Sequence, residues 1–174
     1  MTDTMSKIAA GLERAFARGG FAEPSVETLR DAAGVSLRTL YKYTPSRDDM
    51  VLAALENRHQ RYLSHVFDGL PDNTEDATNA ILARVGTWMA KEASHGCLFH
   101  AAVAADPNSD TLRRFLKRHK AEVASRAAAA TGLEVAETEL LVIVEGLTQA
   151  WPLHGDAAVE AAIRLAHALR VSLG

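Results

Sequence analysis

Apolar side chains recur at the spacing of an α-helix along nearly the whole chain of 174 residues, and no alternation typical of a β-strand persists. In the segment 5–18, for example, Ile8, Leu12 and Phe16 fall on one helical face, which predicts that this face is buried. The Gly19-Gly20 pair that follows is typical of the end of a helix. Such stripes are buried only when helices pack against one another, so we predict an all-α fold.

Capping residues and helix breakers divide the rest of the chain. Ser25 and Ser36 are expected N-caps, whereas Gly34 and Pro45 each end a helix. Further breaks are expected at residues 95–96, 106–108, 132 and 152–155. The predicted helices span about residues 5–18, 26–33, 37–43, 46–67, 75–94, 97–104, 109–131, 136–150 and 156–173.

A loop at residues 69–73, which contains glycine, proline, aspartate and asparagine, separates two parts of the chain. We therefore expect an N-terminal domain over residues 1–47 and a C-terminal domain over residues 68–174. The helix over about residues 48–67 connects them.

The two short helices around Gly34 have the spacing of a helix-turn-helix, in which the second helix lies in the DNA major groove. Gly34 supplies the positive φ that the turn needs. Leu29, Val35 and Leu40, with Val26, are expected to form the small core that fixes the pair. We predict that the DNA-binding residues are Ser36, Leu37, Arg38, Thr39, Tyr41, Lys42, Tyr43 and Arg47.

The charge of this segment agrees with that role, although the net charge of the chain is −3. Residues 34–47 contain Arg38, Lys42 and Arg47 and no acid, so a short basic face can meet phosphates. Lysine and tyrosine suit phosphate contacts, whereas arginine is the commonest reader of guanine. For Arg38, the sequence leaves base reading and phosphate contact equally open.

The motif resembles the tetracycline-repressor (TetR) family of regulators. The resemblance rests on residues 33–43, on Pro45-Ser46-Arg47 and on Phe16 with residues 19–21, and it covers about residues 5–55. Two positions depart from the family pattern. Thr44 stands where phenylalanine usually packs under the recognition helix, and Arg30 stands where alanine is usual between the two helices. Both departures bear on the angle of the recognition helix.

The resemblance implies a homodimer, in which the last two helices of each copy form a four-helix bundle. On these helices, apolar or small residues step by four and three positions. The predicted dimer residues are Leu140, Val144, Leu147, Ala162, Ala166 and Leu169. The alternative is a monomer whose own core takes up these stripes.

The resemblance also implies a ligand cavity among the middle helices. The residues that could line it are Trp88, Phe99, His100, Phe115, His119 and Trp151. Each of them is also an ordinary core candidate. Cys97 is read as part of a helix start; a redox role would need an exposed thiol with a lowered pKa.

Other classes of protein find little support. The seven histidines lack metal-site spacing, since His95 and His100 are five residues apart and His59 and His65 are six apart. No nucleophile elbow or phosphate loop is present, so we expect no enzyme, no metal and no cofactor. No run is long and apolar enough for a membrane span, the first residues do not read as a secretory signal, and a single cysteine excludes an internal disulfide. We therefore expect a cytoplasmic location.

The resulting prediction is a transcriptional repressor that binds a palindromic double-stranded DNA operator and is released by a small-molecule effector. Three alternatives stay open: an activator, a ligand-binding or interaction protein of the same fold without DNA binding, and a small all-α enzyme. The sequence names neither the operator nor the effector.

Overall fold

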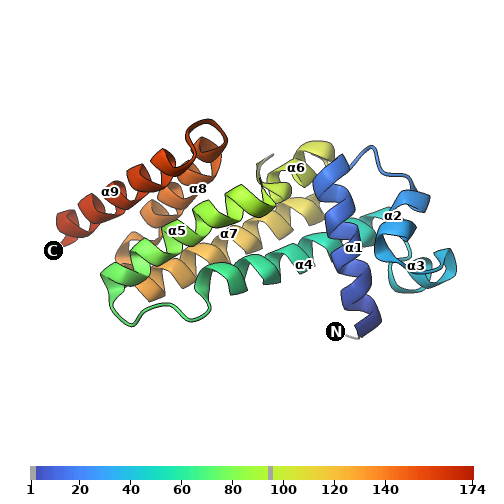
Figure 1. Ribbon diagram of the computed structural model, residues 1–174, viewed down its shortest axis with the longest axis horizontal. Helices are drawn as coiled ribbons and strands as arrows, with labels where there is room; N and C mark the ends of the chain where they lie inside the picture. The colour runs from blue at the N-terminus through green and yellow to red at the C-terminus, as the bar shows by residue number, and fades with distance from the viewer. Residues whose placement is uncertain (1–2, 94–95) are drawn as a thin grey trace. The chain divides into compact units, whose positions relative to one another are not determined.

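The computed structural model describes residues 3–93 and 96–174, and all regular structure within them is helical, which confirms the all-α prediction (Figure 1). The helices are α1 (Asp3–Gly19), α2 (Val26–Ala33), α3 (Leu37–Tyr43), α4 (Arg47–Phe67), α5 (Thr74–Glu92), α6 (Leu98–Ala105), α7 (Asp110–Thr131), the 3-10 turn η1 (Glu134–Ala136), α8 (Glu137–His154) and α9 (Asp156–Leu173).

Most predicted boundaries lie within two residues of the observed ones, and those of α2 and α3 coincide. The prediction was wrong at the end of α8, which continues through Pro152 to His154. A proline inside a helix removes one backbone hydrogen bond. The helix tolerates this loss because it ends soon afterwards, at Gly155. The predicted break at 95–96 lies partly outside the described residues.

The chain forms two compact units. Unit 1 contains residues 3–61 and 98–116, and unit 2 contains residues 62–93, 96–97 and 117–174. The helices α4 and α7 each contribute residues to both units. Residues 98–116 thus belong to the same unit as the N-terminal helices, although they come after the loop at residues 69–73 that was predicted to separate the two domains.

In unit 1, α1 packs closely against α2, and a glycine makes this approach possible. A Cβ atom added at Gly11 would lie 2.4 Å from the carbonyl oxygen of Ala32 and 2.5 Å from the Cα of Ala33. Both atoms belong to the backbone and cannot rotate away. Helix α1 also contributes Ile8, Leu12 and Phe16 to a fully buried core, as the periodicity predicts.

We expect Gly11→Ala to lower the free energy of unfolding by about 1–3 kcal/mol, because the added methyl group would push α1 away from α2. The control is Ser125→Thr in α7, which also adds one methyl group but at an exposed position. That change should alter the free energy of unfolding by less than about 0.5 kcal/mol, as surface substitutions usually do. Urea unfolding followed by circular dichroism measures both, and equal effects would contradict the steric account.

In unit 2, α5, α8 and α9 pack against one another, and α8 and α9 form an antiparallel pair (Figure 1). Gly86 on α5 allows α9 to approach closely, since an added Cβ would lie 2.5 Å from Cγ2 of Val159. The buried core of this unit includes Leu63, Val66, Val85, Met89, Val123, Val144, Leu147 and Ala162.

Candidate functional site

The turn between α2 and α3 has the geometry that the sequence predicts. Ser25 and Ser36 cap the two helices, and their hydroxyls accept hydrogen bonds from the backbone N–H groups of Thr28 and Thr39. Gly34 lies in the left-handed region, with φ 63°, and its N–H donates to the carbonyl of Arg30. Together these contacts fix where α3 begins.

Buried leucines hold α2 and α3 together. Leu29 and Leu40 are fully buried, as predicted, whereas Val26 and Val35 are half-buried. Thr44, at the end of α3, is also buried, and its hydroxyl donates to the carbonyl of Leu40 at 2.9 Å. A hydrogen-bonded threonine therefore fills the position where a phenylalanine was expected from the resemblance.

Arg30 does not enter the contact between the helices. Its guanidinium lies partly exposed and forms an ion pair with the neighbouring Asp31, at 2.7 Å. The side chain therefore points outward, and the close approach in this region is made at Gly11. The long side chain at position 30 thus lies outside the contact between α2 and α3.

Four of the predicted DNA-binding residues form one solvent-exposed face of α3. Leu37, Arg38, Tyr41 and Lys42 are exposed and occupy positions i, i+1, i+4 and i+5, which share a side of a helix. The face thus combines two cations with one aliphatic and one aromatic side chain. It can contact phosphates, base edges and thymine methyl groups.

The other predicted residues of this segment are less available. Thr39 and Tyr43 are half-buried, and the hydroxyls of Ser36 and Thr39 lie 2.8 Å apart in a hydrogen bond. The Nζ of Lys42 lies 5.6 Å from the ring centroid of Tyr43. Tyr43 therefore supports Lys42, and the exposed face is narrower than the sequence suggests.

Arg47 was predicted to contact DNA, but its guanidinium is hydrogen-bonded to the backbone of the segment between α1 and α2. It donates to the carbonyls of Phe21 at 2.7 Å and Pro24 at 3.0 Å, and its Cζ lies 5.7 Å from the ring centroid of Phe16. These contacts hold the segment between α1 and α2. Arg47 is a positioning residue here, and no local sequence signal indicated this, because its partners are 23 and 26 residues away.

A buried carboxylate that the sequence analysis did not single out joins α1 to α4. Glu13 is 2% exposed and accepts hydrogen bonds from Asn57 at 2.6 Å, Arg58 at 3.1 Å and Arg61 at 2.6 Å. A buried charge is tolerated only with such partners. This network orients α1, on which α2 is packed, relative to the middle of α4.

The six residues predicted for an effector cavity fall in different units. In unit 1, the rings of Phe99 and Phe115 stack with centroids 6.0 Å apart. His100 does not fit the prediction of a cavity wall, because it is exposed. It lies on α6 away from the buried face formed by Leu98, Phe99 and Ala102.

In unit 2, the buried residues Trp88 and His119 both contact the ring of Tyr62, with centroid distances of 5.3 Å and 5.5 Å. Burial, together with the nearby carboxylate of Glu145, raises the pKa of Tyr62, so this hydroxyl stays protonated at neutral pH. The helical period alone did not distinguish Tyr62 from other core residues.

Unit 2 also contains two polar features, an ion pair and an unpaired indole N–H group. Lys120 forms an ion pair with Glu145 at 2.6 Å, and its Nζ lies 3.8 Å from the Sγ of Cys97. The buried indole N–H of Trp151 has no acceptor among the described residues. Buried donors are nearly always paired, so this nitrogen is an exception among the described residues.

The predicted dimer residues lie inside unit 2. Leu140, Val144, Leu147, Ala162 and Ala166 are each at most 4% exposed, and Leu169 is half-buried against the small core around Leu140. These six side chains face the chain's own core and offer little surface to a partner. Their burial favours the opposite stripe of α8 and α9 as the surface that could meet a partner.

The opposite stripe of the same two helices is exposed. Val142 on α8 and Leu165 on α9 are 65% and 59% exposed. They border an apolar groove of about 510 Å³, which is also lined by the small residues Gly146, Ala150, Ala157 and Ala161. Small residues let helices approach closely, so this groove can accept another helix.

Within residues 3–93 and 96–174, no three or more metal-binding side chains gather around a common point. None of the helices in these ranges combines the length and the apolar character that crossing a membrane requires.

Known proteins resemble this chain in two ways: a family model matches its N-terminal residues, and several solved structures share its fold. Residues 4–54 match the family model described as bacterial regulatory proteins, tetR family. No curated protein matches the sequence.

Among solved structures, the chain is similar to a TetR-family transcriptional regulator from Streptomyces coelicolor (18% identity, 96% of this chain and 88% of that chain, TM-score 0.80). It is also similar to a TetR transcription regulator from Haloarcula marismortui (18% identity, 96% of each chain, TM-score 0.77). A third similar structure is the multidrug binding protein EbrR complexed with malachite green (20% identity, 94% of this chain and 98% of that chain, TM-score 0.70). At these identities, the structural similarity establishes the fold.

Proposed function

We propose that this chain, whose residues 4–54 match the model of the tetR family of bacterial regulatory proteins, is a regulator of that family and represses transcription by binding an operator through the exposed face of α3. The observation that carries this proposal is that face itself, which presents Arg38 and Lys42 beside Leu37 and Tyr41 on a helix-turn-helix. The helix is short and begins at a capped N-terminus, as in other recognition helices that enter the major groove.

The proposed binding form is a homodimer that pairs through the exposed stripe of α8 and α9. A dimer places two recognition helices on the half-sites of a palindromic operator. Val142 and Leu165 supply the apolar surface, and the groove beside them supplies a close fit. These contact residues differ from the six predicted from the sequence, which are buried or half-buried inside unit 2.

The proposed effector is a small molecule held within unit 2. Trp88 and His119 line a buried aromatic cluster there, and Trp151 has a buried donor that an effector's acceptor could satisfy. The solved structure of EbrR with malachite green supports the idea that this fold accepts organic ligands. Release of DNA requires that the effector bind the DNA-incompatible conformation more tightly.

The first test is a fluorescence-anisotropy titration against DNA from immediately upstream of the coding region, at two salt concentrations, with an unrelated duplex as control. A specific operator should be bound about a thousandfold more tightly than the control. Weak binding of both duplexes at equal affinity would argue against an operator at this position. Failure to bind either duplex at low salt would favour a ligand-binding protein without DNA binding, because phosphate contacts strengthen as salt falls.

Once an operator is identified, Arg38→Ala should weaken operator binding by about 1–3 kcal/mol for each bound subunit and reduce the preference for operator over control DNA. Lys42→Ala should instead weaken binding to all duplexes, and the slope of log affinity against log salt concentration should fall by about 1 for each bound subunit. Arg126→Ala, on α7 and paired with Glu122, is the control and should change neither quantity. If Arg38→Ala lowers both affinities equally, Arg38 contacts phosphate and does not read bases.

A further inference from the structure

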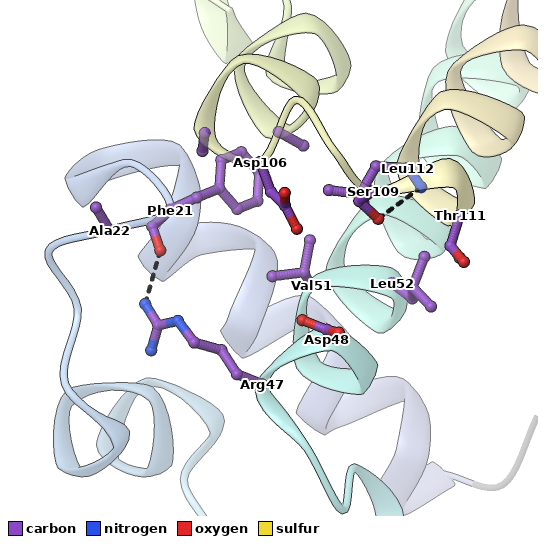
Figure 2. Close-up of a pocket in the computed structure, with 12 residues that line it drawn as sticks. Phe21, Ala22, Arg47, Asp48, Val51, Leu52, Asp106, Ser109, Thr111 and Leu112 are labelled. Atoms are coloured by element: carbon purple, nitrogen blue, oxygen red, sulfur yellow. Dashed lines mark hydrogen bonds between the residues drawn. The ribbon is translucent and has the colours of Figure 1, made fainter.

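Unit 1 contains a cavity that the proposed regulator function does not use. It has a volume of about 290 Å³ and lies between the segment after α1, the start of α4, the end of α6 and the start of α7 (Figure 2). All of its lining residues belong to unit 1. None of the six residues predicted for the effector cavity lines it.

The walls of this cavity are largely apolar. Phe21 and Val51 are buried and face it from two sides, while Leu52 and Leu112 are half-buried along its edge (Figure 2). Apolar walls with a few polar groups are typical of small-molecule sites. About ten water-sized groups fill such a volume, so a ligand of about ten non-hydrogen atoms would fit.

The charged groups at the cavity favour a cation. Asp106 points its carboxylate into the space beside Val51, and Asp48 lies at the start of α4 on the opposite side (Figure 2). Asp106 accepts only a backbone hydrogen bond from Asn108, at 3.3 Å. Neither aspartate forms an ion pair with any side chain in the described part of the chain.

The one cation that lines the cavity is directed elsewhere. The guanidinium of Arg47 donates to the carbonyls of Phe21 and Pro24 and forms no ion pair with either aspartate. The partial negative charge at the end of α6 is opposed by the partial positive charges at the starts of α4 and α7. Two carboxylates against one guanidinium leave the lining residues with a formal charge of −1.

We propose that this cavity binds a small organic ammonium ion, with the charged nitrogen between Asp48 and Asp106 and an apolar body against Phe21, Val51 and Leu52. The carboxylates supply charge-assisted hydrogen bonds, and the walls remove the body from water. A neutral molecule of the same shape would gain only the second contribution. An anion would meet two like charges.

The test is isothermal titration of the full chain with 2-phenylethylammonium chloride, compared with 2-phenylethanol and phenylacetate, which have the same aromatic body. The ammonium should bind about tenfold more tightly than the alcohol, because it pairs with two exposed carboxylates, and the anion should bind more weakly than the alcohol. Equal binding of the ammonium and the alcohol, or no binding of the ammonium at millimolar concentration, would overturn the proposal.

Two sets of variants locate the site. Asp106→Asn and Asp48→Asn are substitutions of exposed side chains, and each should lower the affinity for the ammonium about threefold or more while leaving that for the alcohol unchanged. Ala105→Phe, which fills the cavity from an exposed position, should abolish binding of both. The matched control is Ala104→Phe on the same helix, which is also exposed but does not line the cavity. Ammonium binding that survives both aspartate substitutions would place the ligand elsewhere and reject the site.

Discussion

Replacing Glu13 with alanine is expected to lower the free energy of unfolding by about 3–5 kcal/mol, the range found when one partner of a buried ion pair is removed. The carboxylate is 2% exposed and accepts hydrogen bonds from three side chains of α4, including Arg58, which is itself 3% exposed. Its loss leaves a buried guanidinium without this carboxylate. Domains are stable by only about 5–15 kcal/mol, so unit 1 would be close to unfolding.

Urea unfolding followed by circular dichroism measures this effect, and Glu122→Ala on α7 is the matched control. Glu122 also pairs with an arginine, Arg126, at 2.7 Å, but the side chains of Glu122 and Arg126 are 35% and 46% exposed. Surface pairs contribute about 0.3–0.5 kcal/mol, so the control should change little. If both variants lost similar free energies of unfolding, burial would not explain how much Glu13 stabilises the fold. Glu13→Gln, which keeps the size and one acceptor, should lie between the two.

Placing a charge on the exposed stripe of α9 should dissociate the proposed dimer. With Leu165→Glu, each copy brings a carboxylate into an apolar surface, and the two-fold symmetry of a dimer doubles the change. Burying an unpaired charge costs several kcal/mol, so we expect the dissociation constant of the dimer to rise by about a hundredfold or more. The wild-type side chain is 59% exposed, so the substitution should leave the folded chain intact.

Sedimentation velocity over a range of concentrations measures this dissociation. The control is Val135→Glu in η1, where the wild-type valine is 85% exposed and lies outside the groove between α8 and α9. A monomeric Leu165→Glu variant beside a dimeric Val135→Glu variant is the expected result. A Leu165→Glu variant that remains a dimer would reject this stripe, and a monomeric wild-type chain would reject the dimer altogether.

The parts of the fold that depend on local signals could be predicted from the sequence. The bounds of α2 and α3 follow from Ser25, Gly34 and Ser36, because caps and a positive φ act within a few residues. Once the ends of α3 were predicted, the residues on its exposed face could be predicted too, because they lie on one side of a short helix. The burial of Leu29 and Leu40 was accessible for the same reason.

Features that depend on distant partners could not be predicted in this way. Periodicity marks apolar stripes on α8 and α9 but does not say which one faces the chain's own core, so Leu140 and Val144 were assigned to a partner. Arg47 has the composition of a phosphate contact, yet carbonyls more than twenty residues away bind it. Glu13 is an ordinary helix residue until the fold brings α4 against it.

Helix α9 is fastened to the rest of unit 2 at two points. Near the C-terminus of α9, Arg170 donates to the carbonyl of Thr131 at 2.7 Å and to the hydroxyl of Thr78 at 3.1 Å. In the first turn of α9, Val159 packs against Gly86 of α5. A helix held to α5 at both places cannot slide or tilt without carrying α5 with it. In the proposed dimer, the surface that each copy presents to its partner therefore moves when α5 moves. A molecule that displaces α5 in one copy would change the contact between the two copies, so binding to one copy would affect the whole dimer.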